Sequence, residues 1–162
     1  MNEKFEEFQT ALEDLKDSLT CPTYWKKVSD SCILLSSEYT DFDTAVEKCK
    51  DLDAKLYEPQ SLSHNQLVYA LIEEKGQEDQ PFWIGIHDKD TENSFVYQSN
   101  NQPIAFQHWG SFTDRYGGPQ PNNFDGNQNC VEIRGADDIW DGPKGSWNDE
   151  KCFHKNRFIC EK

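Results

Sequence analysis

Long apolar runs are missing from this sequence of 162 residues, and none approaches the about 20 residues that span a membrane. The first residues, Met1 to Lys4, also lack the apolar segment of a secretory signal. Either a signal has been removed or the protein is intracellular. Hydrophobic residues make up 35% of the chain and aromatic residues 13%, so a single domain of this length needs an aromatic core.

Positive charge is scarce as well. The chain has 16 Lys and Arg residues against 30 Asp and Glu residues, which gives a net charge of −14. Nucleic acids and anionic membranes would repel such a surface, so neither is an expected partner. Acidic residues are frequent between residues 120 and 150, where they indicate either a solubilising surface or a cation site.

The usual catalytic motifs are absent. The histidines do not form the His-Glu-x-x-His pair of zinc hydrolases, and the chain has no Gly-x-Ser-x-Gly elbow or glycine-rich phosphate loop. These histidines are His64, His87, His108 and His154. We therefore expect a binding protein rather than an enzyme.

Six cysteines are present, with neither a Cys-x-x-Cys pair nor a zinc-finger spacing. They are Cys21, Cys32, Cys49, Cys130, Cys152 and Cys160. An even number without metal spacing is typical of disulfide bonds, which form in oxidising compartments. The cysteines therefore predict a secreted, extracellular protein, while their spacing alone leaves the pairing open.

An amphipathic helix is predicted within residues 1–20, where apolar residues recur at spacings of three and four. These residues are Phe5, Phe8, Leu12, Leu15 and Leu19. Pro22 ends the segment because proline cannot continue a helix. The seam through residues 5–19 suits a short coiled coil between copies of the chain, and the alternative is a helix packed on its own domain.

Two further helices are predicted between residues 41 and 76. The first, capped by Asp41 or Asp43, continues to Leu56. A capping box at residues 63–66 begins the second, at residues 67–74, which Gly76 ends.

Strands are predicted on both sides of these helices. Residues 24–28 and 33–35 read as a hairpin before them. Later strands are predicted at residues 82–86, 95–97, 131–133 and 158–160. Residues 100–129 are rich in Gly, Pro, Asn and Gln, and a loop of this length is either functional or disordered.

Four motifs follow one another along this part of the chain. They are Trp83-Ile84-Gly85-Ile86, Gln120-Pro121-Asn122, Trp147-Asn148-Asp149 and the C-terminal Phe158-Ile159-Cys160-Glu161-Lys162. In these motifs and their order, the sequence from Cys21 onward resembles the C-type lectin-like domain family. The resemblance implies an α+β fold, in which two helices pack on small antiparallel sheets beside a long loop region.

The same resemblance implies how the chain is divided and cross-linked. Residues 1–20 would be a helical extension, and residues 21–162 a carbohydrate-recognition domain. The implied disulfide bonds are Cys49–Cys160, Cys130–Cys152 and Cys21–Cys32.

A calcium site in the long loop is also implied by the resemblance, with a cis peptide bond between Gln120 and Pro121 and with sugar hydroxyls completing the ion's shell. Its ligands would be Gln120, Asn122, Gln128, Asn148 and Asp149. In the motif that falls on Gln120-Pro121-Asn122, the family combines Glu at the first position with Asn at the third, or Gln with Asp, and this chain has an amide at both positions. Gln128 also stands where the family has Glu. Because calcium affinity depends on ligand charge, we expect a weak site, and no sugar preference is indicated.

A second calcium site of the family falls on Asp88, Glu92, Asn123 and Asn129. The alternative for this segment is a polar turn between strands. The spacing Asp88-x-Asp90-x-Glu92 looks like the start of an EF-hand. That motif is excluded, because Asn93 replaces its turn glycine and Ser99 its closing glutamate.

Two insertions flank the principal site. Phe112 and Tyr116, within residues 111–118, are available either to stack on a sugar or to pack the loop. The acidic residues of the later insertion are expected to be solvated turn residues; they are Asp137, Asp138 and Asp141.

We therefore predict a secreted, calcium-dependent lectin that binds carbohydrate or a glycoconjugate, in the setting of innate immunity. One alternative is a calcium-independent domain of the same fold that binds protein, ice or mineral surfaces, which the few carboxylates at the site and the net charge of −14 favour. Another is a structural oligomer that depends on the N-terminal helix.

Overall fold

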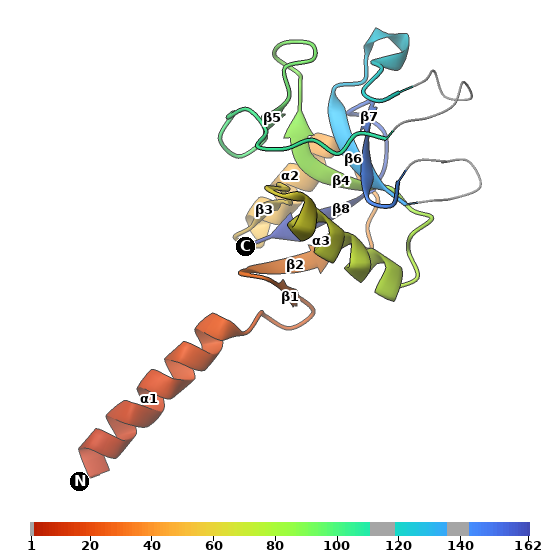
Figure 1. Cartoon of the computed structure of the whole chain (residues 1–162). Coiled ribbons are helices and arrows are strands. Elements are labelled where there is room, and N and C mark those ends of the chain that lie inside the picture. The colour runs from red at the N-terminus through yellow and green to blue at the C-terminus, as the bar shows by residue number, and fades with distance from the viewer. Residues whose placement is uncertain (1, 111–118, 136–142) are drawn as a thin grey trace.

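The computed structural model describes residues 2–110, 119–135 and 143–162, without the side chains of residues 13–19. The first element is the predicted N-terminal helix, α1 (Asn2–Leu19). Figure 1 shows that α1 extends away from the rest of the chain, on the side opposite the short 3-10 helix η2 (Phe124–Gly126).

Three of the five seam residues of α1 are exposed to solvent. Phe5, Phe8 and Leu12 are 63%, 63% and 48% exposed, so these side chains do not pack into the core of their own domain. The side chains of Leu15 and Leu19 lie outside the described part of the chain. Self-association through residues 5–19 stays a prediction.

One part of the sheet joins the N-terminal hairpin to the C-terminus. Strands β1 (Lys26–Val28) and β2 (Ser31–Leu35) form the predicted hairpin. Strand β8 (Arg157–Glu161) pairs antiparallel with β2 and with the short strand β3 (Lys55–Leu56). Leu56 pairs with Cys160 there, so the prediction that it ends a helix is wrong.

The other part of the sheet carries the long loop. Strand β4 (Phe82–His87) runs parallel to β8 and pairs antiparallel with β6 (Cys130–Arg134) and with the short β5 (Val96–Tyr97). Strand β7 (Ser146–Glu150), which the sequence did not predict, pairs antiparallel with β6. The order β1-β2-β8-β4-β6-β7, together with the helices, confirms the α+β fold.

Helix α2 (Phe42–Asp51) begins where its cap predicts. The Asp41 carboxylate accepts a hydrogen bond from the Thr44 backbone N–H at 2.8 Å, which satisfies a donor of the first turn. The helix ends at Asp51, with Leu52 as its C-cap, short of the predicted end. Its buried face packs on residues of β3, β4 and β8; the buried residues are Phe42, Ala45, Val46 and Cys49.

Helix α3 (Leu62–Glu74) begins earlier than predicted. The hydroxyl of Ser61, not that of Ser63, accepts the hydrogen bond from the His64 backbone N–H, at 3.2 Å. Ser61 has the extended backbone that a cap requires (φ −155°, ψ 157°), whereas Ser63 lies inside the helix. Gly76, with φ +64°, follows the end of the helix as predicted.

The core is aromatic, as the composition predicts. The largest fully buried aromatic side chains are those of Phe42, Tyr57, Tyr69, Phe82, Trp83 and Trp147. The indole N–H of Trp147 donates a hydrogen bond to Asn65 Oδ1 at 3.1 Å, and that of Trp83 to Thr40 O at 2.9 Å. Both motif tryptophans therefore anchor their strands without leaving a buried donor unsatisfied.

All three implied disulfide bonds are present: Cys21–Cys32, Cys49–Cys160 and Cys130–Cys152. The second joins residues that are 111 positions apart and fastens α2 to the last strand. Closing a loop of that length stabilises the fold by about 4–5 kcal/mol in a chain-entropy model. The bond clamps the body of the domain, and the long loop is part of the segment that it closes.

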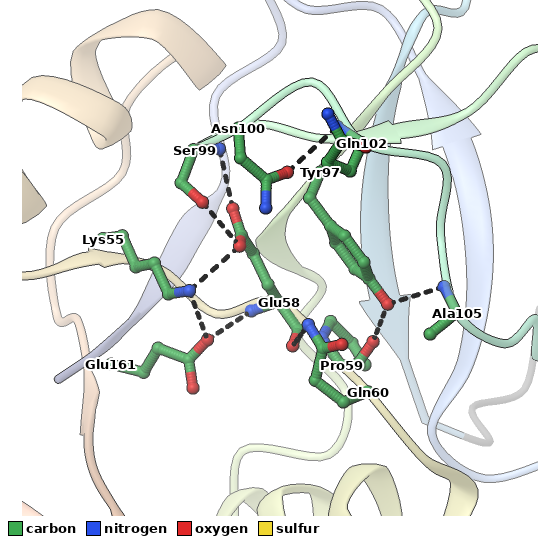
Figure 2. Close-up of polar contacts among 10 residues, drawn as sticks. All are labelled: Lys55, Glu58, Pro59, Gln60, Tyr97, Ser99, Asn100, Gln102, Ala105 and Glu161. Atoms are coloured by element: carbon green, nitrogen blue, oxygen red, sulfur yellow. Dashed lines mark hydrogen bonds and ion pairs between the residues drawn. The ribbon is translucent and has the colours of Figure 1, made fainter.

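The base of the long loop is fastened by a buried carboxylate (Figure 2). Glu58, 2% exposed, accepts hydrogen bonds from the backbone N–H and the hydroxyl of Ser99, each at 2.8 Å. The Lys55 ammonium lies 3.0 Å from the same carboxylate and neutralises its charge. The Tyr97 hydroxyl donates to Pro59 O at 2.6 Å, which holds the end of β5 to the same segment.

Candidate functional site

The predicted site residues come from two elements. Asn148 and Asp149 lie on β7, where they pair with Glu132 and Val131 of β6. The other residues of the principal site precede β6 in the segment that contains η2, which Figure 1 shows near the ends of β6 and β7. In this segment the Gln120–Pro121 peptide bond is cis, as expected.

Asp149 fastens the loop to β7. Its side chain is 1% exposed, Oδ1 accepts a hydrogen bond from Asn122 N at 3.1 Å, and Oδ2 accepts one from Asn123 N at 2.7 Å. Burial raises the pKa of this carboxyl, and the backbone donors oppose the rise. Asp149 thereby brings together one residue of each predicted calcium site.

Gln128 continues this connection. Its Oε1 accepts from Phe124 N at 3.0 Å, and its backbone N–H donates to Asn123 Oδ1 at 2.9 Å. Gln120 is 7% exposed, and its backbone N–H donates to Gly110 O at 2.9 Å. The structure therefore links Asn122, Asn123, Gln128 and Asp149 directly, whereas these hydrogen bonds tie Gln120 to the start of the loop.

Asp88 of the second predicted site is an incompletely satisfied buried acid. It follows β4 directly and is 2% exposed; its Oδ2 accepts from Asn93 N at 2.8 Å. Its backbone N–H donates to Asn129 O at 3.0 Å, so these two predicted ligands are adjacent. The other oxygen, Oδ1, is buried without a hydrogen-bond partner.

Three carboxyl groups act on one another across the two predicted sites. Burial raises the pKa of Asp88, while the hydrogen bond from Asn93 N and the contact with the Glu92 side chain oppose the rise. Burial also raises the pKa of Glu92, and the charges of Asp88 and Asp149 raise it further. The charge of Asp88 adds to the effect of burial on the pKa of Asp149 as well. The charges of Asp88 and Asp149 thus act on Glu92, and negative charge is gathered between the two predicted sites.

The donor set fits a hard cation. Calcium takes six to eight oxygen ligands from carboxylates, amide carbonyls and backbone, and these are the groups that the loop and β7 bring together. A cation would satisfy the buried Oδ1 of Asp88 and screen the repulsion among the three acids. In the described part of the chain no three His, Cys, Asp or Glu residues are grouped tightly enough to form a metal site by themselves. The amide oxygens would have to supply the remaining ligands.

Sequence reasoning missed two residues beside the site. Phe124 is 56% exposed, and its backbone N–H is held by Asn122 Oδ1 and Gln128 Oε1. The sequence feature that could have identified Phe124 is an aromatic residue in a polar loop, two positions after the Gln120-Pro121-Asn122 motif. No feature of the sequence identifies Glu132, which is 1% exposed, because its burial depends on the pairing of β6 with β7.

The residues of the two predicted insertions lie outside the described part of the chain. They are Phe112, Tyr116, Asp137, Asp138 and Asp141.

Comparison with known proteins identifies the family. The model of the lectin C-type domain matches residues 38–162. The chain is 30% identical over 155 residues to human C-type lectin domain family 3 member A, covering 93% of this chain and 69% of that protein. It is 24% identical over 158 residues to bovine pulmonary surfactant-associated protein D, covering 98% of this chain. The chain spans only 37% of the length of that second relative.

Solved structures agree with this assignment. The carbohydrate-recognition domain of the mouse scavenger receptor C-type lectin has a TM-score of 0.70 and 28% identity, covering 88% of this chain and 95% of that one. The calcium-free form of a Ca2+-dependent type II antifreeze protein, at 23% identity and a TM-score of 0.68, shares the fold; the match covers 88% of this chain and 99% of that one. No helix in the described residues is long and apolar enough to cross a membrane. The chain belongs to the lectin C-type domain family.

Proposed function

We propose that this domain binds carbohydrate through calcium, without catalysing a reaction. The observation that supports this proposal most directly is the buried Oδ1 of Asp88, which has no hydrogen-bond partner and lies among the repelling carboxyls of Glu92 and Asp149. A buried charge of this kind is costly unless a cation or a donor meets it. Relatives in the lectin C-type domain family support calcium as that cation.

The residues of the principal site would have different roles in binding. When bound, calcium supplies open coordination positions for sugar hydroxyls. Asp149 supplies the single carboxylate, while the amide oxygens of the other residues are neutral ligands and hydrogen-bond partners for the sugar. These residues are Gln120, Asn122, Gln128 and Asn148.

The second site should bind its ion more tightly than the principal site. Asp88 and Glu92 bring two carboxylates to it, joined by Asn123 and Asn129. Because affinity rises with the number of charged ligands, calcium should fill this site first and the principal site at higher concentration.

Calorimetric titration with calcium, with and without mannose or galactose, tests the proposal. We expect a calcium dissociation constant of about 0.1–1 mM, the range of extracellular modules, or a weaker one at the principal site. A heat of sugar binding should be observed only when calcium is present. Asp149→Asn should abolish sugar binding, whereas Asp30→Asn removes an exposed acid on the hairpin turn and should change nothing. A calcium midpoint beyond about 50 mM without sugar heat would contradict the proposal, because it lies far outside that range.

Gln120→Glu should strengthen the principal site. The substitution restores a second carboxylate there, and we expect calcium affinity to rise about tenfold, which corresponds to about 1.4 kcal/mol. In the family that the sequence resembles, Glu with Asn in this motif favours mannose-like sugars, so the substitution should also shift preference towards mannose over galactose. The same titration measures both, and an unchanged affinity would mean that no ion lies beside residue 120.

Phe124→Ala should weaken sugar binding alone. The exposed ring is available to pack on the apolar face of a sugar, while only the backbone of Phe124 contacts Asn122 and Gln128. We expect a several-fold loss of sugar affinity at unchanged calcium affinity. Phe153→Ala removes a comparably exposed ring, 65% exposed, and serves as the matched control.

Secretion and self-association complete the proposal, and a role in innate immunity stays a prediction. The three disulfide bonds support an oxidising, extracellular location.

The exposed Phe5, Phe8 and Leu12 support association through α1, because a helical apolar seam exposed to water favours a partner. Sedimentation of the full chain and of a chain beginning at Thr20 should differ in assembly state. If both chains have the same assembly state, the helix does not mediate self-association.

A second candidate is calcium-independent binding of protein, ice or mineral by the same loop face. The principal site has one carboxylate among five predicted ligands, which favours this alternative. Binding that survives EDTA and Asp88→Asn, but not substitutions on the loop surface, would support it.

A further inference from the structure

Glu132 is a buried carboxylate in direct contact with a predicted calcium ligand. It lies on β6 opposite Asn148 of β7 and is 1% exposed. Its Oε1 accepts a hydrogen bond from Asn148 Nδ2 at 2.9 Å, and its Oε2 accepts one from Asn156 Nδ2 at 2.6 Å. The Arg134 guanidinium lies 3.2 Å from Oε1 and offsets its charge.

The direction of the Asn148 amide follows from this contact. An asparagine side chain has a donor end and an acceptor end on the same planar group, so only one of them faces a given neighbour. Because the NH2 group of Asn148 donates to Glu132, its carbonyl oxygen faces away from Glu132. A cation needs that carbonyl oxygen and is repelled by the NH2 group.

We propose that Glu132 is a positioning residue, which holds the Asn148 amide so that its carbonyl oxygen is available to the loop site. This role rests on the proposed function, in which Asn148 is a calcium ligand. Glu132 itself would touch neither the ion nor the sugar.

A carboxylate suits this role because both of its oxygens accept hydrogen bonds. Glu132 therefore fixes two amides at once, and the second one, Asn156, is itself held by backbone hydrogen bonds with Thr40 at 2.8 and 2.9 Å. A glutamine at position 132 would have one acceptor and one NH2 group. That NH2 group would meet the NH2 of Asn148 or Asn156, and one of these amides would have to turn.

The test is Glu132→Gln in the full chain, followed by calcium calorimetry. We expect calcium affinity to fall by about 10–100-fold, the usual effect of losing a group that orients a metal ligand. Glu161→Gln is the matched control: Glu161 is also buried and accepts a backbone hydrogen bond, from Glu58 N at 2.8 Å, on the other part of the sheet. It should lower stability without changing the calcium affinity of the folded protein.

A double variant separates positioning from simple structural support. In E132Q/N148D the glutamine NH2 group can donate to the introduced carboxylate, and the glutamine oxygen can accept from Asn156. The amide donors of residues 132 and 156 then each meet an acceptor, and the second oxygen of the introduced carboxylate faces away from residue 132, as the Asn148 carbonyl does in the wild type. We expect calcium affinity at least equal to that of the wild type. Failure of the double variant to regain affinity, while it remains folded, would overturn the inference.

A readout without metal distinguishes the two levels of the proposal. In calcium-free protein, the side-chain amide protons of Asn148 should exchange slowly with solvent by NMR, and Glu132→Gln should remove that protection. If the wild type binds no calcium, the proposed function fails and the ligand role of Asn148 fails with it. If the wild type binds calcium and Glu132→Gln binds it equally well, only the inference about Glu132 is overturned.

Discussion

Glu58 and Asp88 are both 2% exposed and each has a second acid nearby, Glu161 and Glu92 respectively, yet their other neighbours differ. Glu58 receives two hydrogen bonds from Ser99 and lies against the Lys55 ammonium, as Figure 2 shows. Asp88 receives a hydrogen bond from Asn93 N, keeps a buried oxygen without a partner, and has the acidic Glu92 beside it.

The difference separates a structural acid from a binding acid. A buried carboxylate is stable when donors and an opposite charge surround it, and Glu58 has both within the chain. At Asp88 the described part of the chain provides neither in full, and under the proposed function a bound cation would supply the missing charge.

The largest effect is expected at Glu58. Glu58→Gln removes the charge that faces Lys55 and turns an NH2 group towards one of the Ser99 donors. We expect the free energy of unfolding to fall by about 2–3 kcal/mol, since breaking a buried ion pair by changing one partner costs up to about 3–5 kcal/mol. Urea unfolding in EDTA and in calcium should give the same loss. If calcium abolished this loss of stability, Glu58 would belong to the calcium site and not to the structural acids.

Asp88→Asn should behave in the opposite way. Without calcium it removes a buried, desolvated charge and keeps an acceptor for Asn93 N, so the free energy of unfolding should stay equal or rise by up to about 1 kcal/mol. With calcium it should lose the stabilisation that a bound ion gives, about 1.4 kcal/mol at ten times the dissociation constant. Urea unfolding under both conditions measures this. A fall of more than about 2 kcal/mol in EDTA would make Asp88 a structural residue like Glu58.

The smallest effect is a pH dependence that belongs to Asp88. Burial raises its pKa in the folded state above the ordinary value of 3.8, so between the two values the folded chain binds more protons than the unfolded chain. Its contribution to stability is therefore present in full below the ordinary pKa and is lost as the pH rises through the raised pKa. In EDTA, the stability of the wild type relative to Asp88→Asn should decrease with rising pH over this window. A difference that stays constant with pH would mean that Asp88 is not desolvated.

The sequence predicted the architecture better than the details of its elements. Motif order and the cysteines indicated the fold and all three disulfide bonds, because they are tied to core strands and the family pattern. The start of α3 was misplaced, since Ser61 and Ser63 both offer a capping hydroxyl and only the backbone decides between them. Strand β7 was missed because its sequence, SWNDE, is mostly polar and becomes a strand through its pairing with β6.

The site was predictable where it depended on motif position. The cis bond before Pro121 is present as expected, and hydrogen bonds join Asn122, Gln128 and Asp149 into one group, whose role as ligands stays a prediction. The roles of Glu58 and Glu132 were not predictable, because in a chain with 30 acids a buried carboxylate has the same local pattern as a solvated one. Only tertiary pairing reveals which acids leave water.

The direction of α1 has a consequence for weak binding. The helix leaves the domain on the side opposite η2, so chains joined through their helices would turn their loop faces outward together (Figure 1). Once one loop face has bound a surface with repeated sugars, the other faces of the assembly are at a high local concentration beside it. The avidity of the assembly then exceeds the affinity of a single site by about 100–10,000-fold. Such an assembly would ignore a lone sugar and respond to a dense coat of them.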